Sequence, residues 1–351
     1  MPSRIAVVLF NLGGPDRPEA IRPFLLNLFT DPAILRVPFF VRPFLARWIA
    51  RSRLAPAQTN YAALGGSSPL LALTRQQAAA LETELSDLDA KCFIAMRYWH
   101  PFSDVTAREV RDWMPDEIVL LPLYPQYSST TTGSSLTAWR EAAARVGLAV
   151  NTTTLCCYPT DPGYVAATAG LLLSAYRTAR AQLGPSISLR LLFSAHGLPE
   201  SIVRRGDPYQ WQIEQTVASV LAIFGQADLD WVICYQSRAT PQRWIGPSTD
   251  AEIERAAHDK VAVLVVPIAF VSEHSETLVE LDIDYRAMAE RLGIRGYFRV
   301  PAQNSDPAFI AALAGLVRHA VSCGPGICSS ARGRLCPTDR RDCPIAMAGA
   351  A

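Results

Sequence analysis

The stretch LRLLFSAHGLP, residues 189–199, joins a run of aliphatic residues to a histidine and a glycine at its end. Comparable aliphatic or β-branched runs lie at 5–11, 92–97, 118–123, 189–194, 231–236 and 261–268. Such near-continuous apolarity is typical of parallel strands that are covered on both faces. Between these runs, residues 74–88 and 307–321 have the periodicity of amphipathic helices. The pattern predicts an α/β fold with βαβ crossovers.

The strand-like stretches also resemble one another in pairs. IAVVLFNLGGP (5–15) is similar to LRLLFSAHGLP, and IVLLPLYPQYSSTTTGS (118–134) is similar to VLVVPIAFVSEHSETL (263–278). Chance similarity between buried strands is the alternative explanation. We expect two similar Rossmann-like lobes, each a parallel sheet flanked by helices, with a cleft between their C-terminal strand ends. The expected divisions are 1–160 for the first lobe, 161–320 for the second, and 321–351 for a cysteine-rich tail.

The composition argues against several functional classes. The 33 basic residues nearly balance the 32 acidic ones, so no global field attracts a polyanion such as nucleic acid. No apolar run approaches the roughly 20 residues that a membrane-spanning helix needs. The N-terminus goes straight into strand-like sequence without the apolar region of a secretory signal. We therefore expect a cytoplasmic enzyme, in which the eight cysteines are metal ligands or buried thiols rather than disulfides.

An insertion, residues 18–70, separates the first two strands and contains ILRVPFFVRPFLARWIARSRL (34–54). The segment mixes aromatic residues with arginines: Phe39, Phe40, Phe44, Trp48, Arg36, Arg42, Arg47, Arg51 and Arg53. This mixture is typical of an element that lies at a membrane surface or lines the entrance for an apolar ligand. An amphipathic helix docked on its own lobe is the simpler alternative. A nucleic-acid surface is disfavoured because the chain has no wider basic patch.

Among the five histidines, His196 has the position best suited to chemistry. It follows a buried strand and precedes Gly197, so it lies at the C-terminal edge of a sheet, where α/β folds bind their ligands. A purely structural role is the alternative for a single histidine at this position.

A second candidate site is the acidic stretch that follows the strand at 261–268. It contains Glu273, His274, Glu276 and Glu280, and on a helix Glu276 and Glu280 share one face. The helix dipole explains an acidic first turn but not Glu280, so we expect a cation or a shared proton there. Imidazole and carboxylate groups hold a divalent metal moderately tightly or accept protons, so they can pass either onward. The sequence contains no serine-hydrolase elbow, dinucleotide fingerprint or Walker loop.

Taken together, the motifs resemble those of the ferrochelatase family, whose members insert ferrous iron into a porphyrin at or near the end of haem synthesis. The matching stretches are NLGGP (11–15), FLLNLFTDPAIL (24–35), YAALGGSSPL (61–70), MRYWHP (96–101), LYPQYSSTTTGSS (123–135), FSAHGLPESIVRRGDPY (193–209), QSRATPQRWIGP (236–247) and PIAFVSEHSETLVELDIDY (267–285). They follow the family's order. The resemblance implies two Rossmann-like lobes around a porphyrin cleft.

The resemblance also implies roles for individual residues. The family's active-site histidine corresponds to His196 and its opposing glutamate to Glu276, and these two would contact the iron substrate. The family's outer acidic path corresponds to His274 and Glu280. The residues implied to bind or line the porphyrin are Arg97, Tyr98, Tyr61, Ser68, Met96 and Trp244.

A mechanism follows from the chemistry of these substrates. Two inner N–H protons of a free porphyrin block the metal, so the enzyme must bend the ring, remove both protons and deliver a dehydrated ion. We expect His196 to abstract protons or hand over the metal, with Glu276, His274 and Glu280 relaying protons or metal on the other side of the ring. Which side carries metal and which carries protons stays open. Arg97 is expected to pair with a propionate or to tune the pocket electrostatically.

The C-terminal tail is rich in Gly, Pro and Arg and has no core of its own, so its thiols indicate a metal as the organiser. Its cysteines are Cys323, Cys328, Cys336 and Cys343. Some ferrochelatases carry a [2Fe-2S] cluster on three C-terminal cysteines and one cysteine from the body of the protein. The intervals here differ from the animal pattern, and Ser129 replaces the body ligand.

The pair Cys156 and Cys157 then offers the fourth ligand, and only one of them is expected to reach a cluster because consecutive strand residues point to opposite faces. The expected [2Fe-2S] ligands are Cys328, Cys336, Cys343 and one of that pair. A structural zinc and free or redox-reactive thiols are the alternatives.

Two other functions compete with iron insertion. One is a chelatase that inserts cobalt or nickel into a tetrapyrrole, and the other is a non-catalytic porphyrin or haem carrier. The segment 34–54 corresponds to the family's apolar lip, which favours peripheral contact with the inner face of the membrane. The sequence leaves open whether the porphyrin is protoporphyrin IX or coproporphyrin III and whether the chain forms a homodimer.

Overall fold

The computed structural model describes residues 3–226, 228–237 and 242–348 of the chain. These residues form two compact units, of which unit 1 is Met1–Cys157 with Leu313–Arg334 and unit 2 is Tyr158–Ala312 with Leu335–Ala351. Each unit contains one parallel sheet flanked by helices. The predicted α/β class with two parallel sheets is confirmed.

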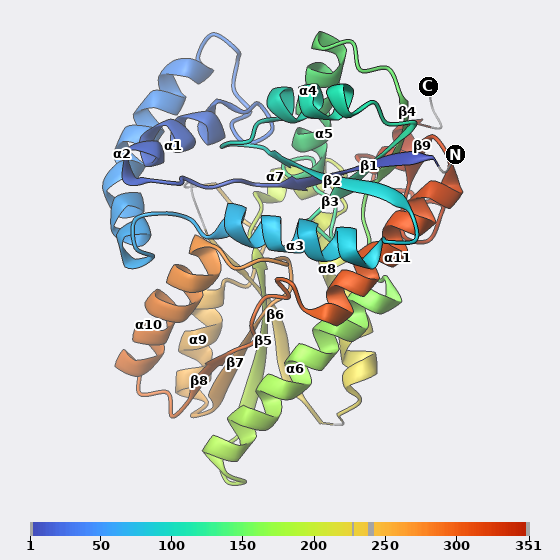
Figure 1. Cartoon of the computed structure of the whole chain (residues 1–351). Coiled ribbons are helices and arrows are strands. Elements are labelled where there is room, and N and C mark those ends of the chain that lie inside the picture. Colours follow the sequence, from blue (N-terminus) through green and yellow to red (C-terminus); the bar gives the residue numbers. More distant parts are fainter. Residues whose placement is uncertain (1–2, 227, 238–241, 349–351) are drawn as a thin grey trace. The chain divides into compact units, whose positions relative to one another are not determined.

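The sheet of unit 1 has the order β2-β1-β3-β4-β9. Its strands are β1 (Arg4–Asn11), β2 (Asp89–Met96), β3 (Glu117–Pro122), β4 (Asn151–Leu155) and β9 (Gly326–Cys328). Helices α4 (Ser103–Trp113) and α5 (Thr132–Arg145) cover one face, and α3 (Leu70–Glu84) lies on the other (Figure 1). Strand β1 is buried from residue 5 to residue 11, because both of its faces are covered.

Side-chain alternation on β1 builds the core of unit 1. Val8 and Phe10 point to the same face and pack with Val110 of α4 and Trp139 of α5. The rings of Phe10 and Trp139 meet edge to face, with their centroids 6.0 Å apart. This packing holds the C-terminal ends of β1 and β3 in fixed positions for the loops that follow them.

The insertion between β1 and β2 folds into η1 (Pro18–Ala20), α1 (Ile21–Thr30) and α2 (Arg42–Ala63). One side of α2 packs on α1 through the small residues Ala46 and Ala50. The aromatic residues point away from this contact: Phe39, Phe40, Phe44 and Trp48 are 80%, 64%, 73% and 68% exposed. The segment therefore docks on its own unit and also leaves an apolar surface uncovered.

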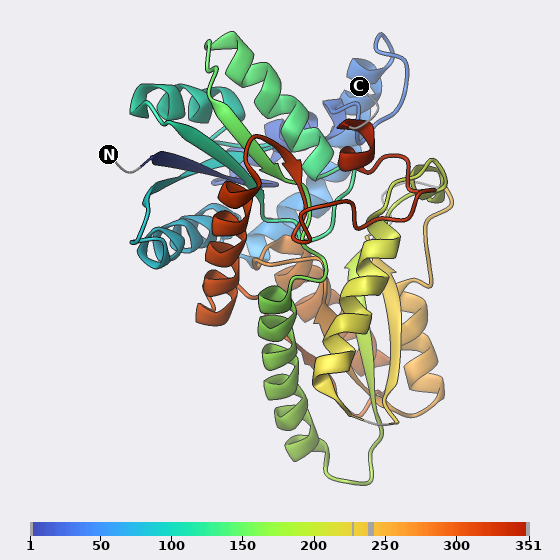
Figure 2. The ribbon, with the colours of Figure 1, turned by 90° about the vertical axis from the view of Figure 1, so that its right-hand side faces the viewer.

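The sheet of unit 2 has the order β6-β5-β7-β8. Its strands are β5 (Leu189–His196), β6 (Asp230–Gln236), β7 (Ala262–Pro267) and β8 (Tyr297–Arg299). Figure 2 shows α6 (Pro162–Leu183) and α8 (Tyr209–Phe224) on one face, with α9 (Thr249–His258) and α10 (Tyr285–Arg291) on the other. The short α7 (Glu200–Arg204) follows β5. The central strands β5 and β7 are almost wholly buried, which explains why their sequences are nearly continuous runs of apolar residues.

Three short strands and one helix type differ from the sequence expectation. The threonine-rich β4 and the three-residue strands β8 and β9 lack the aliphatic runs that indicate the longer strands. The acidic stretch forms η2 (Glu276–Asp284), which is a π-helix rather than the expected α-helix. π-Helical segments are rare in proteins as a whole, and those that do occur are often found at functional sites.

The C-terminal segment is shared between the units. Helix α11 (Pro307–Cys323) contains the boundary between Ala312 and Leu313, β9 belongs to unit 1, and α12 (Pro344–Ala348) belongs to unit 2. Strand β9 pairs with β4 and so extends the sheet of unit 1. Residues 238–241 of the QSRATPQRWIGP motif lie outside the described residues. No helix within the described ranges is long and apolar enough to cross a membrane.

Candidate active site

His196 is the last residue of β5, and the next residue must be very small. A Cβ atom on Gly197 would lie 2.9 Å from the Gln236 carbonyl oxygen and 3.3 Å from the Trp244 ring. The Gly197 N–H also donates to the Gln236 carbonyl, 2.8 Å away. Glycine thus allows β5 to continue beside the end of β6, and it brings Trp244 next to the histidine.

His196 and Glu276 are in direct contact, because the distance from His196 Nδ1 to Glu276 Oε2 is 2.9 Å. An ionised carboxylate can only accept, so Nδ1 carries the proton and Nε2 is left as the basic nitrogen. The sequence interpretation placed these two side chains on opposite sides of a porphyrin. That separation is wrong for this structure, since a ring cannot lie between two atoms in hydrogen-bond contact.

The environment moves the pKa values of the pair in opposite directions. Burial opposes the charge on His196, but the Glu276 carboxylate and then Glu280 outweigh it and raise the pKa of His196. Burial likewise opposes the charge on Glu276, yet His196 and His274 hold the pKa of Glu276 well below its usual range. The contact therefore favours the ion pair, imidazolium with carboxylate.

His274 supplies a second imidazole for the same carboxylate. Its Nδ1–H donates to the Ser272 carbonyl at 3.1 Å, and its Nε2 lies 3.9 Å from Glu276 Oε2. The His274 backbone N–H donates to Thr277 Oγ1 at 3.0 Å, which fixes the start of η2. Glu276 thus lies between two imidazoles, an arrangement that can move a proton from one to the other.

Glu280 lies one turn further along η2 and accepts from the end of β6. Gln236 Nε2 is 3.0 Å from its Oε2, and the Ser237 backbone N–H is 3.1 Å from its Oε1. Ser237 has a φ of 63°, a left-handed conformation that is uncommon outside glycine and turns its N–H to the carboxylate. Burial and then the Glu276 charge raise the pKa of Glu280, against the hydrogen bonds from Ser237 and Gln236.

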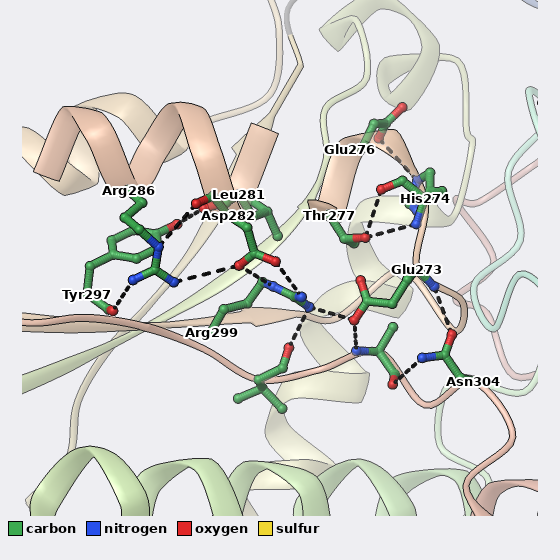
Figure 3. A network of polar contacts seen from close by, with 12 residues as sticks. Glu273, His274, Glu276, Thr277, Leu281, Asp282, Arg286, Tyr297, Arg299 and Asn304 are labelled. Atoms are coloured by element: carbon green, nitrogen blue, oxygen red, sulfur yellow. Dashed lines mark hydrogen bonds and ion pairs between the residues drawn. The ribbon is translucent and has the colours of Figure 1, made fainter. Parts of the chain in front are cut away.

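An arginine on β8 links the two ends of this acidic segment (Figure 3). Arg299 forms two contacts with Asp282, of 2.8 and 2.6 Å, and a third of 2.8 Å with Glu273 Oε1. Glu273 Oε1 also accepts from the Ala302 N–H at 2.9 Å. Because Glu273 precedes His274 and Asp282 lies near the end of η2, Arg299 fixes the segment that contains Glu276 and Glu280.

Unit 1 contains a second polar cluster, centred on Asp31. Asp31 Oδ2 accepts from Arg97 Nη2 at 2.8 Å, from the Tyr98 hydroxyl at 2.7 Å and from Ser134 Oγ. Arg97 Nε also donates to Ser134 Oγ at 2.6 Å. Burial and then the Asp31 charge raise the pKa of Tyr98 well above its usual range, so its hydroxyl stays a donor. The predicted Arg97–Tyr98 pair is thus oriented by one buried carboxylate.

The other predicted porphyrin residues of unit 1 gather where β1 ends. Gly13 has a φ of 83°, and a Cβ atom there would lie 3.2 Å from Met96 Cβ. A Cβ on Gly14 would lie 2.5 Å from Ser68 Oγ and 3.9 Å from the Tyr61 hydroxyl. The two glycines of the NLGGP motif therefore let Met96, Ser68 and Tyr61 approach the same turn of the backbone.

A cavity of about 380 Å³ opens beside Arg97 within unit 1. Its size is within the range of small-molecule sites. Its polar lining includes Asp31, Arg97, Ser129 and Ser134. Ser129 accepts from Arg36 Nη2 at 2.9 Å.

The predicted cluster cysteines are buried but belong to different units. In unit 1, Cys156 and Cys157 have their sulfurs 3.6 Å apart, and Cys328 lies close enough to Cys157 to sense its charge. In unit 2, Cys336 accepts from Gln212 Nε2 at 3.1 Å. Burial raises the pKa of the Cys328 thiol to about 12. A different group is formed by Cys328 with Cys323 and His319.

Several residues of these clusters are absent from the sequence prediction. They are Asp31, Ser134, Gln236, Ser237 and Arg299. The only signal for Asp31 was an acid inside the apolar stretch 24–35, and Gln236 ended a predicted strand. Ser237 and Arg299 depend on long-range contacts that no local pattern indicates.

The fold and the site together define a class of enzyme. Parallel α/β sheets with a histidine–carboxylate pair at a strand end suit the handling of metal ions and protons. The sirohydrochlorin chelatase SirB from Bacillus subtilis subspecies spizizenii, solved in complex with cobalt, has a similar fold. Its TM-score is 0.51 at 11% sequence identity, over 91% of this chain and 96% of that chain. The chain thus has the fold of a chelatase.

Sequence comparison then gives the family. The Ferrochelatase family model matches residues 4–321. The ferrochelatase of Caulobacter vibrioides (strain NA1000 / CB15N) is 51% identical over 348 residues, which cover 98% of this chain and 98% of the relative. That of Hyphomonas neptunium (strain ATCC 15444) is 49% identical over 354 residues, covering 99% and 96%. The chain belongs to the ferrochelatase family, the lyases that insert iron into porphyrin to form haem.

Proposed function

We propose that the chain inserts ferrous iron into protoporphyrin IX or coproporphyrin III, and that His196 and Glu276 act together from one side of the ring. The 2.9 Å contact between His196 Nδ1 and Glu276 Oε2 is the observation that carries this proposal. With the proton held on Nδ1, the Nε2 atom of His196 is the base that accepts a pyrrole proton. Glu276 then stabilises the imidazolium, as a carboxylate does for a catalytic histidine.

The neighbouring acids give the two protons a route away from the ring. Glu276 favours its ionised form, whereas Glu280 has its pKa raised. Two carboxyl groups with different pKa values can take different roles. The ionised Glu276 can accept a proton, and Glu280, whose pKa is raised, can then hold it. His274, 3.9 Å from Glu276, offers a second exit for the charge. The same oxygen and nitrogen atoms can guide the incoming iron, so metal and protons share one acidic path in this proposal.

The residues of unit 1 are proposed to hold the porphyrin rather than to move protons. Arg97 carries a permanent positive charge, and Asp31 and Ser134 fix its orientation. Such a fixed guanidinium suits a propionate of the substrate or the charge of the distorted ring. Met96 and Tyr61 are proposed to contact the bent ring through their apolar and aromatic surfaces and Ser68 through its hydroxyl, and Trp244 of unit 2 is proposed as a further aromatic contact.

The assay that tests this function measures metal insertion by the purified chain. We expect Fe²⁺ and Zn²⁺ to enter protoporphyrin IX or coproporphyrin III, with little reaction of sirohydrochlorin. Preferential insertion of cobalt or nickel into sirohydrochlorin would assign the chain to the competing chelatase function. Tight porphyrin binding without insertion of any metal would make it a carrier.

We also propose that the chain carries a [2Fe-2S] cluster on Cys328, Cys336, Cys343 and one of Cys156 and Cys157. Five buried sulfurs are a donor set that suits this cluster, since Fe–S clusters are held by cysteine thiolates. The amide N–H of buried Gln212, 3.1 Å from the Cys336 sulfur, is the kind of hydrogen bond that tunes such a centre. The bound cluster would supply a one-electron redox centre.

Visible absorbance and an assay for iron and sulfide in the purified protein test the cluster. Two irons and two sulfides per chain are expected, with both lost on Cys343→Ser. Zinc in place of iron would support a structural zinc site. If the protein contains neither metal, the cysteines are free thiols.

The exposed aromatic face of residues 39–48 is proposed to contact the inner face of the membrane. Four aromatic side chains that are each more than half exposed, beside several arginines, suit an anionic interface. Flotation with vesicles that contain anionic lipid tests this. A Phe44→Ser, Trp48→Ser double variant should stay with the unbound fraction, and equal flotation of both proteins would contradict the proposal.

A further inference from the structure

A group of potential metal ligands lies in unit 1, at the end of α11 and in β9. His319 and Cys323 are four residues apart in the last turn of α11, and Cys328 ends β9. The ligand atoms of these three residues all lie within 4.8 Å of one another. The distance from Cys323 Sγ to His319 Nε2 is 3.6 Å.

The backbone around this group is held in place by unit 1. Gly324, with a φ of 74°, follows the helix, and its carbonyl accepts from Thr153 Oγ1 at 2.7 Å. Strand β9 pairs with β4, so the Cys328 carbonyl accepts from the Cys156 N–H at 2.8 Å. The helix end and the strand therefore present their side chains from fixed positions, which is what a preorganised binding site requires.

We propose that His319, Cys323 and Cys328 bind a thiophilic divalent cation of the zinc class. The spacing, H-x3-C-x4-C, is short and local like that of structural zinc sites, and imidazole with two thiolates is a ligand set that Zn²⁺ accepts. The carbonyl end of a helix also favours positive charge. Because Cys323 is exposed, water completes the tetrahedron.

One existing hydrogen bond must change when the cation binds. His319 Nε2 lies 2.9 Å from the Ser329 carbonyl oxygen, and a carbonyl only accepts, so Nε2 carries the proton in this structure. Coordination through Nε2 moves that proton to Nδ1 and gives up the bond to Ser329. The two thiols also lose their protons on binding. Metal binding at this site is therefore expected to release protons and to strengthen with rising pH.

This site and the proposed cluster share Cys328, so they exclude one another. The cation is expected to bind only to chain from which any cluster has been removed. The inference does not depend on iron insertion, because metal binding here is measured without porphyrin.

Cobalt and zinc titrations of the cluster-free, full-length chain test the proposal. One equivalent of Co²⁺ should give thiolate charge-transfer and tetrahedral d–d absorption, and Zn²⁺ should displace it. Cys323→Ser and His319→Gln should each weaken zinc binding by more than about tenfold, since the loss of an outer-shell partner alone costs about 10–100-fold. Cys92→Ser, on β2 and outside both proposed metal sites, is the matched control and should bind zinc as the unmodified chain does.

Two outcomes overturn the proposal. The first is the absence of stoichiometric Co²⁺ binding by the unmodified chain. The second is binding that survives Cys323→Ser but is lost in Cys343→Ser, which would assign the ion to the cluster cysteines. Far-ultraviolet circular dichroism before titration identifies any variant that does not fold. Zinc should raise the Tm of the unmodified chain and leave that of folded Cys323→Ser unchanged.

Discussion

The polar clusters of the two units hold a carboxylate in opposite ways. In unit 1, Asp31 is bound by Arg97, whose charge is permanent, and by two hydroxyl groups. In unit 2, Glu276 Oε2 lies 2.9 Å from His196 Nδ1 and 3.9 Å from His274 Nε2, and an imidazole, unlike a guanidinium, can take up and release a proton. Both clusters lie next to strand ends of a parallel sheet. We infer that position at a strand end does not by itself make a site of proton transfer, and that the partner of the carboxylate decides whether protons can move.

The largest effect is expected for His196→Ala, which removes the proposed base. Iron or zinc insertion should fall by about 10²–10⁴-fold, the usual contribution of general acid–base catalysis. Porphyrin binding, followed by fluorescence quenching, should change little because the contacts of unit 1 remain. Full insertion activity in this variant would contradict the proposal that the cluster of unit 2, and not that of unit 1, transfers protons.

Glu276→Gln should lower kcat by about 10²-fold and change the pH profile. The Glu276 charge raises the pKa of His196, so its removal lowers that pKa. Since the base acts in its neutral form, the acidic limb of kcat/KM should move to lower pH. Glu214→Gln, on the exposed part of α8, serves as control. If the acidic limb of kcat/KM does not shift in Glu276→Gln, the ionisation of His196 does not determine that limb.

Arg299→Met should lower activity about tenfold, the lower end of what loss of a positioning partner costs, by releasing the segment that holds His274 and Glu276. Arg286→Met is the matched control, because Arg286 is 42% exposed and its ion pair with the same Asp282 is longer, at 3.9 Å. A shift of the acidic limb in Arg299→Met alone would identify a positioning role. Equal loss of Tm and an unchanged pH profile in both variants would reduce Arg299 to a structural residue.

The smallest effect on the pH profile is expected for Asp31→Asn. Breaking a buried ion pair costs about 3–5 kcal/mol, and the 23% exposure of Arg97 places this pair at the lower end. Denaturant unfolding should report that loss, while KM for porphyrin rises and the acidic limb stays unchanged. A moved limb would mean that the Asp31 cluster also takes part in proton transfer.

Local pattern was sufficient for the parts of the molecule where one residue type repeats. The buried strands β5 and β7 could be predicted because both faces of each demand apolar side chains. The acidic stretch 273–284 was found from its charge density. Its π-helical form could not be predicted, because the contacts of Asp282 and Glu280 that accompany it come from β8 and β6.

The distance between His196 and Glu276 was equally beyond the sequence. Eighty positions separate them along the chain, and their hydrogen bond depends on where η2 begins after β7. Local pattern singled out both residues, His196 at the end of a buried strand and Glu276 in an acidic stretch, and the family resemblance implied their roles. Their contact, and the roles of Asp31 and Ser237, required the packed structure.

The division of the chain also affects how it is made on the ribosome. Strand β9, which pairs with β4 at one edge of the sheet of unit 1, consists of residues 326–328. Synthesis of all of 158–312 must come first. During that interval β4 is an unpaired edge, the kind of surface on which nascent chains aggregate. The threonines of β4, which made this strand hard to predict from sequence, are polar and therefore lower the tendency of that edge to aggregate before β9 pairs with it.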